Sequence, residues 1–310
     1  MQGLELARAF YARCRPFLEE RVPDLLAQAA AGLVGEGSEC LGCDDAISRD
    51  HDFGAAFCLW LPERVLVKDG PRLEAALGAL PTEFDGVPSR LVPQRRGGRV
   101  GPLAIETFYG FFGVRSPALA VDEWLHIPEY HLCSCTNGAV FEDNLGEFSR
   151  WREALAAYYP RDVWLKKLAA RCMQAAQAGQ YNLPRALRRG DAMAALLAMG
   201  RFAEAALALV YLCNRRYMPF YKWAGLLAAD LPTLGPEVCA LVRQLAARPV
   251  QGASAAEVCA LIEAFCTQVA RHLHAVGLSD RPGNWLWEHG LAVHCHINDK
   301  ELGAMDILRV

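Results

Sequence analysis

The sequence predicts an α+β protein, with a small mixed sheet in its N-terminal half and helices alone in its C-terminal half. Two short apolar runs, at 29–34 and 53–61, are followed by glycine or proline, which is typical of buried strands. Farther along, segments rich in Ala and Leu repeat apolar residues at helical spacing. The pattern changes near Gly146, so we place an α/β domain at residues 1–148 and a helical domain at residues 149–310.

Helices and strands alternate in the N-terminal half. Apolar residues at helical spacing predict a helix at 4–26, with a break or a new start at Pro23. The other elements predicted there are, in chain order, a strand at 29–34, a strand at 53–61 before Pro62, a helix at 72–80, a loop at 81–88, a strand at 102–108 that contains Glu106, helical segments at 121–127 and 129–135, and a hairpin or short strand at 138–143.

Successive amphipathic helices are predicted in the C-terminal half. At 162–178, the residues Val163, Leu165, Leu168 and Cys172 contribute to one apolar stripe. Further helices are predicted at 185–199, 203–216, 221–229, 236–247 and 255–276.

The composition is that of a soluble globular protein. The chain has 310 residues, 53% of them hydrophobic and 22% charged, with a net charge of −3. This acidic balance disfavours a wide nucleic-acid footprint. No apolar run is predicted to be long enough to cross a bilayer, and the first residues lack the layout of a secretory signal. We therefore expect a cytoplasmic protein with no membrane partner.

Twelve cysteines are scattered along the chain, and most lie in apolar helical patterns. In a reducing compartment such residues act as small buried hydrophobes. Three groupings raise the alternative of a metal site: Cys40-x-x-Cys43, Cys133-x-Cys135 and His294-Cys295-His296. The first has no second pair at zinc-finger distance. The other two lie in predicted strands, and Cys295 would face the side opposite to its neighbours His294 and His296. A structural zinc is not favoured.

The motif that carries chemistry is Gly37-Ser38, followed after eleven residues by Asp50-His51-Asp52. At alternate positions of a strand, Asp50 and Asp52 would point the same way. Two adjacent carboxylates are costly unless a cation compensates them, and Mg²⁺ binds through one or two carboxylates plus substrate phosphates. The Gly37-Ser38 turn can offer N–H groups and a hydroxyl to those phosphates. Each feature alone is also common in solvated turns, but the ordered combination indicates a two-metal phosphoryl-transfer site.

The segment Gly37-Ser38-x-x-x-Gly42, with Asp50-x-Asp52 after it, resembles the signature of the nucleotidyltransferase superfamily of polymerase-β-like fold. The resemblance is closer to an uncharacterised bacterial branch, domain of unknown function 4037. That branch also has counterparts of the segments that begin Asn137-Gly138-Ala139, Tyr159-Pro160-Arg161, Arg188-Arg189-Gly190 and Arg216-Tyr217-Met218.

The resemblance implies a nucleotidyltransferase-like N-terminal domain and a nucleotide-handling site. It does not itself imply a substrate. From the paired carboxylates we expect Mg²⁺ (or Mn²⁺) as cofactor, held by Asp50 and Asp52, with ATP as the substrate. The resemblance also implies a third carboxylate on a neighbouring strand, for which Glu106 is the first candidate and Asp143 the reserve. The alternative for Glu106 is a solvated residue on the outer face of that strand.

Gly37, Ser38 and Gly42 would meet the phosphates, and Lys222 would offset their remaining charge. The alternative for the segment around Lys222 is a helix start whose aromatic residues are core. A lysine is rarely buried without a partner, which favours the functional interpretation of Lys222 itself.

The leading hypothesis is a metal-dependent nucleotidyltransferase that moves a nucleoside monophosphate, AMP from ATP, onto a small molecule or a protein. The alternative is a non-catalytic nucleotide-binding or interaction module of the same fold. A nucleic-acid partner is a third, weaker option, because aromatic and basic residues are not interleaved along the chain.

Overall fold

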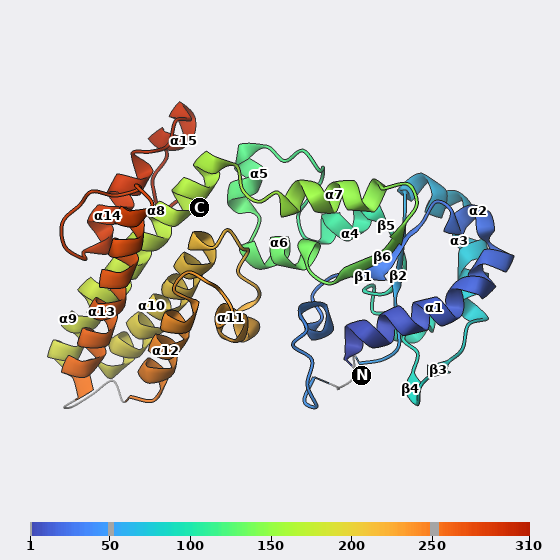
Figure 1. Ribbon diagram of the computed structural model, residues 1–310, viewed down its shortest axis with the longest axis horizontal. Coiled ribbons are helices and arrows are strands. Elements are labelled where there is room, and N and C mark those ends of the chain that lie inside the picture. The colour runs from blue at the N-terminus through green and yellow to red at the C-terminus, as the bar shows by residue number, and fades with distance from the viewer. Residues whose placement is uncertain (1, 49–52, 249–253) are drawn as a thin grey trace. The chain divides into compact units, whose positions relative to one another are not determined.

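The computed structural model describes residues 2–48, 53–248 and 254–310. It divides into two compact units (Figure 1). The N-terminal unit comprises residues 1–123 and 127–157. The helical unit comprises residues 124–126 and 158–310. The chain therefore passes into the helical unit for three residues before it completes the N-terminal unit.

The N-terminal unit contains short strands and helices of mixed length. Its elements are α1 (Gly3–Arg21), α2 (Pro23–Leu26), β1 (Ala30–Leu33), the 3₁₀ helix η1 (Ser38–Leu41), β2 (Cys58–Leu61), α3 (Glu63–Gly78), β3 (Glu83–Phe84), β4 (Val87–Pro88), the 3₁₀ helix η2 (Pro93–Arg95), β5 (Gly101–Ala104), α4 (Ile105–Phe111), the start of α5 (Val121–His126), α6 (Glu129–Thr136), β6 (Ala139–Asp143) and α7 (Glu147–Ala156).

Four of these strands form a mixed sheet in the order β5-β2-β1-β6. β1 pairs antiparallel with β2 and with β6, whereas β2 and β5 are parallel. Because of this register, the end of β1 and the starts of β2, β5 and β6 meet at one end of the sheet, which we call the turn end. The start of β1 and the ends of β2, β5 and β6 meet at the other, which we call the cap end.

Helices cover both faces of the sheet, so its central strands are buried throughout. On one face, Phe57 packs against the rings of Phe10 and Tyr11 on α1. On the other face, Trp60 stacks on Phe148 of α7 with ring centroids 4.0 Å apart. Figure 1 shows α1 and α3 on one side of the sheet and α4 and α7 on the other. The predicted α+β class with a small mixed sheet and a helical C-terminal region is confirmed.

The prediction of a strand over 102–108 is wrong beyond Ala104. β5 ends there, and α4 begins at Ile105, so Glu106 lies in the first turn of a helix. The side chain of Phe108 is placed by this helix against Trp60, with ring centroids 5.4 Å apart. Burial of this aromatic cluster outweighs the strand preference of the β-branched residues in the segment.

The helical unit packs its helices around α8. Its elements are the end of α5, α8 (Arg161–Ala175), a π-helical segment (Ala176–Asn182), α9 (Leu183–Arg189), α10 (Ala192–Cys213), α11 (Tyr221–Ala228), α12 (Gly235–Ala246), α13 (Ser254–Ala275), α14 (Leu286–His294) and α15 (Lys300–Ala304). Helices α10 and α14 lie along α8, which is buried on almost every side (Figure 1).

Residues 124–126 join this unit through specific contacts. The indole of Trp124 meets the Tyr159 ring edge-on, with centroids 5.6 Å apart. The ammonium of Lys167 donates a hydrogen bond of 3.0 Å to the carbonyl oxygen of Leu125. A buried lysine needs such a partner, so this bond fixes the C-terminal end of α5 on α8.

The predicted break between helices at 199–203 is wrong. The break lies at Gly190, which adopts a left-handed conformation with φ +69°, and Asp191 caps α10 by accepting a hydrogen bond from the Ala194 amide. Gly200 lies inside α10. The interpretation of Cys133-x-Cys135 and of His294-Cys295-His296 as strands is also wrong. The first pair lies in α6, which confirms the helix predicted at 129–135, and the second group lies at the end of α14.

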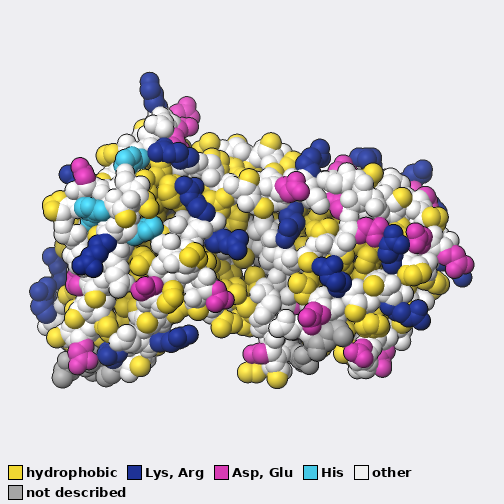
Figure 2. Space-filling view, viewed as in Figure 1, with side chains coloured by type: hydrophobic (Ala, Val, Ile, Leu, Met, Phe, Trp, Pro, Cys, Tyr) yellow, Lys and Arg dark blue, Asp and Glu magenta, His cyan; other side chains and the backbone are white. Residues whose placement is uncertain are grey.

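One helix, α10, has the length and composition of a membrane span, with 22 residues and a mean hydropathy of 1.7. By length and composition alone, α10 therefore contradicts the prediction that no apolar run is long enough to cross a bilayer. Its packing against α8, α9 and α12 is that of a core helix in a bundle. On the face drawn in Figure 2, acidic and basic side chains are interspersed.

Candidate functional site

The turn end of the sheet gathers the residues that the sequence singled out first. The segment 34–42 leaves β1 there, and the segment 53–57 leads into β2 beside it, since Gly32 pairs with Cys58. Leu33 pairs with Ala139, which brings Asn137 and Gly138 to the same place. Asp50 and Asp52 themselves lie outside the described residues, as does His51.

The predicted phosphate turn is a 3₁₀ turn. Gly37 precedes η1. The Gly37 carbonyl accepts a hydrogen bond from the Cys40 amide, and the Ser38 carbonyl accepts one from the Cys43 amide. Gly42 ends the turn with φ +67°, a conformation that favours glycine. The Ser38 hydroxyl makes no hydrogen bond with any of the described residues, so it is available to a ligand.

A side chain at position 37 would overlap the Glu39 carboxylate, because Glu39 folds back over Gly37. The sequence predicted that glycine here lets a phosphate approach the backbone. In the structure, the group that approaches is a carboxylate of the same turn.

Asn137 and Gly138 hold this turn in place. The Asn137 amide group accepts a hydrogen bond of 3.0 Å from the Gly35 N–H and donates one of 2.7 Å to the Gly35 carbonyl. Gly138 has φ +59°, and its N–H donates to the carbonyl of Cys40. The Arg152 guanidinium donates to the carbonyls of Thr136 and Asn137. Sequence reasoning assigned no role to Asn137, although an Asn-Gly pair before a strand is a recognised turn signal.

A buried arginine, Arg90, lies beside the turn. Its side chain is 6% exposed, and its Nη1 is 3.7 Å from Glu39 Oε1. Gly54, two residues after Asp52, packs against the Arg90 side chain. The Arg90 Nε has no hydrogen-bond partner among the described residues. A buried guanidinium adds positive charge where a phosphate would bring negative charge.

A second ion pair lies at the turn end, between Arg99 and Glu36, with 3.7 Å between nitrogen and oxygen. Burial raises the pKa of Cys40 and of Cys58, which keeps these neighbouring thiols neutral. Burial also raises the pKa of Cys43, so Cys40 and Cys43 act here as buried apolar residues. Within the described ranges, no cluster of three or more His, Cys, Asp or Glu side chains could hold a metal ion.

The two candidates for a third carboxylate lie at the cap end instead. Glu106 Oε2 accepts a hydrogen bond of 3.0 Å from the amide of Glu63, the first residue of α3. Asp143 accepts hydrogen bonds from the amides of Gly146 and Ser149 at the start of α7. Both carboxylates therefore cap helices, and the structure does not bring either of them to the Gly37-Ser38 turn.

A family comparison covers the middle of the chain. Residues 124–224 match the family model described as Domain of unknown function (DUF4037). The match supports the resemblance for these residues, and it includes Asn137, Gly138 and Lys222 but not the turn at 37–42. No curated protein compared with the chain gave a match.

Lys222 lies in the first turn of α11, in the helical unit. Its ammonium is exposed and lies 5.2 Å from the centroid of the Trp223 ring. A cation over an indole face is attracted to the ring and remains free to bind an anion.

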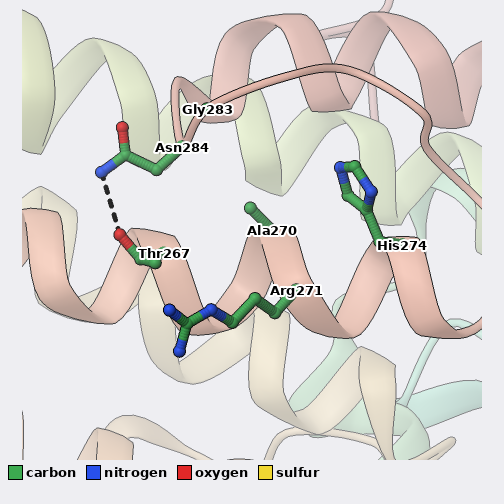
Figure 3. A pocket seen from close by; sticks show the side chains of 6 residues that line it. All are labelled: Thr267, Ala270, Arg271, His274, Gly283 and Asn284. Carbon is green, nitrogen blue, oxygen red and sulfur yellow. Dashed lines mark hydrogen bonds between the residues drawn. The ribbon is translucent and has the colours of Figure 1, made fainter.

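The helical unit also has a surface pocket of about 410 Å³ between α13 and the loop before α14 (Figure 3). Asn284 donates to Thr267 across it, and His274 Nε2 lies 2.7 Å from the carbonyl oxygen of Arg281. Most polar groups of the pocket therefore attach the loop to α13. Among the lining residues, Arg271 is the charged group with no partner in the described structure.

Proposed function

We propose that the protein is a metal-dependent nucleotidyltransferase that moves AMP from ATP onto a small molecule or a protein side chain. The observation that carries the proposal is the register of the sheet. It places the Gly37-Ser38 turn beside residues 53–57, which follow Asp50 and Asp52 in the sequence and lead into β2. Nucleotidyl transfer needs this combination of phosphate-binding turn and acids.

The oxygen donors of Asp50 and Asp52 suit Mg²⁺ or Mn²⁺. Bound metal would supply charge neutralisation at the triphosphate. The Ser38 hydroxyl would donate to a phosphate oxygen, and Arg90 would add a fixed positive charge beside the turn. In the reaction, an acceptor oxygen forms a bond to the α-phosphorus and the bond to pyrophosphate breaks. The acceptor proton passes to solvent or to a base.

Glu106 and Asp143 are not part of this proposal, because both cap helices at the far end of the strands. Among the described acids at the turn end, Glu36 and Glu39 each lie opposite an arginine.

The test is transfer of label from ATP labelled at the α-phosphate. The double variant Asp50→Asn with Asp52→Asn should lose transfer and pyrophosphate release by about 100-fold or more, since several kcal/mol of charge stabilisation depends on the bound metal. Asp45→Asn is the matched control. Asp45 lies in the same loop, its Oδ1 accepts a hydrogen bond from the Ser48 amide, and an asparagine keeps that bond. Equal transfer by the wild type and the double variant would refute the proposal.

The alternative is a nucleotide-binding module without catalysis. Glu106 and Asp143 both cap helices, so neither can serve as the third acid at the turn. This observation favours the non-catalytic module. Calorimetry with ATP, with and without Mg²⁺, separates the two functions. Metal-independent binding with no release of pyrophosphate would support the module.

A further inference from the structure

An arginine–tryptophan cluster lies on the helical unit, where the start of α8 meets the end of α10. It consists of Tyr158, Arg161, Trp164, Arg215 and Tyr217. The guanidinium carbon of Arg215 lies 3.4 Å from the centroid of the Trp164 ring. The rings of Tyr158 and Tyr217 are stacked, with centroids 4.8 Å apart. Three of the five residues fall within the segments 159–164 and 216–223, on which the family resemblance rests. The other two lie directly beside these segments, and all five fall within residues 124–224.

Two residues of this cluster have a strained backbone. Tyr158 has φ +75° and Arg215 has φ +52°, in the left-handed region that favours glycine. Arg215 follows the last residues of α10, and the Arg216 amide donates to the carbonyl of Tyr211. Glycine is the usual residue at this position of a helix terminus. An arginine held there against its backbone preference points to a use for its side chain.

The Arg215 guanidinium is fixed in orientation but not neutralised. The Trp164 Nε1–H donates a hydrogen bond of 2.9 Å to the carbonyl of Leu212, which fixes the indole plane. Stacking uses the face of the guanidinium and leaves its N–H donors in the plane free. Among the described residues, no carboxylate lies within ion-pair distance of Arg215 and no acceptor receives its N–H groups.

Arg161 adds a second cation on the same side of α8, one helical turn before Trp164. One of its nitrogens contacts the His296 carbonyl at 3.0 Å and Asp162 Oδ1 at 3.2 Å. The other oxygen of Asp162 accepts hydrogen bonds from the amides of Asn298 and Asp299. Burial lowers the pKa of Arg215, and the nearby charge of Arg161 lowers it further. An anion bound at Arg215 would offset this repulsion between like charges.

We propose that the arginine–tryptophan cluster binds an oxyanion, the phosphate or carboxylate group of a small molecule. Arg215 provides a planar pair of N–H donors that matches two oxygens of such a group, and Arg161 provides further positive charge. The site consists of residues of the helical unit alone. It does not depend on the proposed nucleotidyl transfer.

The test uses the indole N–H signal of Trp164 in the full-length protein, assigned with a Trp164→Phe variant. Inorganic phosphate and acetate are titrated separately at constant ionic strength, without nucleotide. A saturable shift with phosphate assigns a phosphate group, and one with acetate assigns a carboxylate. If neither anion gives a saturable shift, the proposal is wrong.

Arg215→Gly is the decisive variant, because glycine suits the left-handed backbone and removes the side chain without disturbing the helix end. We expect thermal unfolding close to that of the wild type and affinity for the anion weakened by about tenfold or more, the loss of one charged hydrogen-bonding partner. Arg215→Lys keeps the charge but loses the planar fork, so it should weaken binding less. Arg201→Gln, at an exposed position of α10, controls for net charge. Equal loss in Arg215→Gly and Arg201→Gln would overturn the site.

Discussion

Replacement of Asn137 by alanine tests how the Gly37-Ser38 turn is held. The Asn137 side chain makes two hydrogen bonds to the backbone of Gly35, of 2.7 and 3.0 Å, and Gly35 is buried. Two such bonds contribute about 0.5–1.5 kcal/mol each, and leaving the Gly35 groups unpaired adds a desolvation cost. We therefore expect Asn137→Ala to destabilise the N-terminal unit by about 2–4 kcal/mol.

Hydrogen exchange of peptides that cover β1 and β6 measures this loss in the N-terminal unit itself. Asn137→Asp keeps the acceptor for the Gly35 N–H and loses the donor to the Gly35 carbonyl. The stability of its N-terminal unit should therefore lie between that of Asn137→Ala and that of the wild type. Asn298→Ala in the helical unit is the control and should leave these peptides unchanged. A loss below about 0.5 kcal/mol in Asn137→Ala would refute the bracing role of Asn137.

Three further predictions concern other contacts. The Arg15 guanidinium holds the pKa of Glu142 at about 2, below its ordinary 4.5, so this pair should stabilise the fold fully above pH 4.5 and lose its effect as the pH falls towards 2. Urea unfolding of Glu142→Gln should show a deficit of about 1–3 kcal/mol at pH 7 that disappears near pH 2, and a deficit independent of pH would contradict the assignment. Gly138→Ala should cost about 2–4 kcal/mol, because its Cβ would overlap a carbonyl of β1, whereas Gly86→Ala, at similar φ with open space around it, should cost only about 1 kcal/mol in the same assay. Lys166 is fully buried and donates to two carbonyls of the C-terminal segment, so Lys166→Met should make that segment sensitive to proteolysis while the rest of the helical unit resists; unchanged cleavage would show that other contacts hold the segment.

Local patterns predicted the sheet and most helices, and they failed where tertiary packing decides. Residues Ile105, Glu106 and Thr107 resemble a strand by composition, yet they begin α4, because a helix brings Phe108 and Tyr109 to the aromatic cluster around Trp60. No local signal reports that cluster, since its partners come from distant parts of the chain.

Two glycines of the helical unit give a second example of a wrong local prediction. Gly190 and Gly200 look alike in sequence, but only Gly190 has a capping residue after it, Asp191, and ends a helix. The capping signal was present in the sequence, and giving it more weight would have placed the break correctly.

The candidate site was predictable in part. The Gly37-Ser38 turn follows from its residues, whereas the brace from Asn137 depends on strand pairing more than a hundred residues away. The burial of Arg90 likewise depends on contacts that no periodicity reveals. Glu106 was chosen on the expectation of a strand, and that expectation placed it at the wrong end of the sheet.

Because residues 124–126 belong to the helical unit, the order in which the chain leaves the ribosome affects when each unit can fold. Because β6 and α7 follow these residues, the N-terminal sheet cannot be completed on the ribosome until Trp124 and Leu125 have emerged. Their partners, Tyr159 and Lys167, leave the exit tunnel later still. A nascent chain must therefore expose an apolar tryptophan in mid-sequence for that interval. A single proteolytic cut after Ala157 would leave the helical unit without residues 124–126.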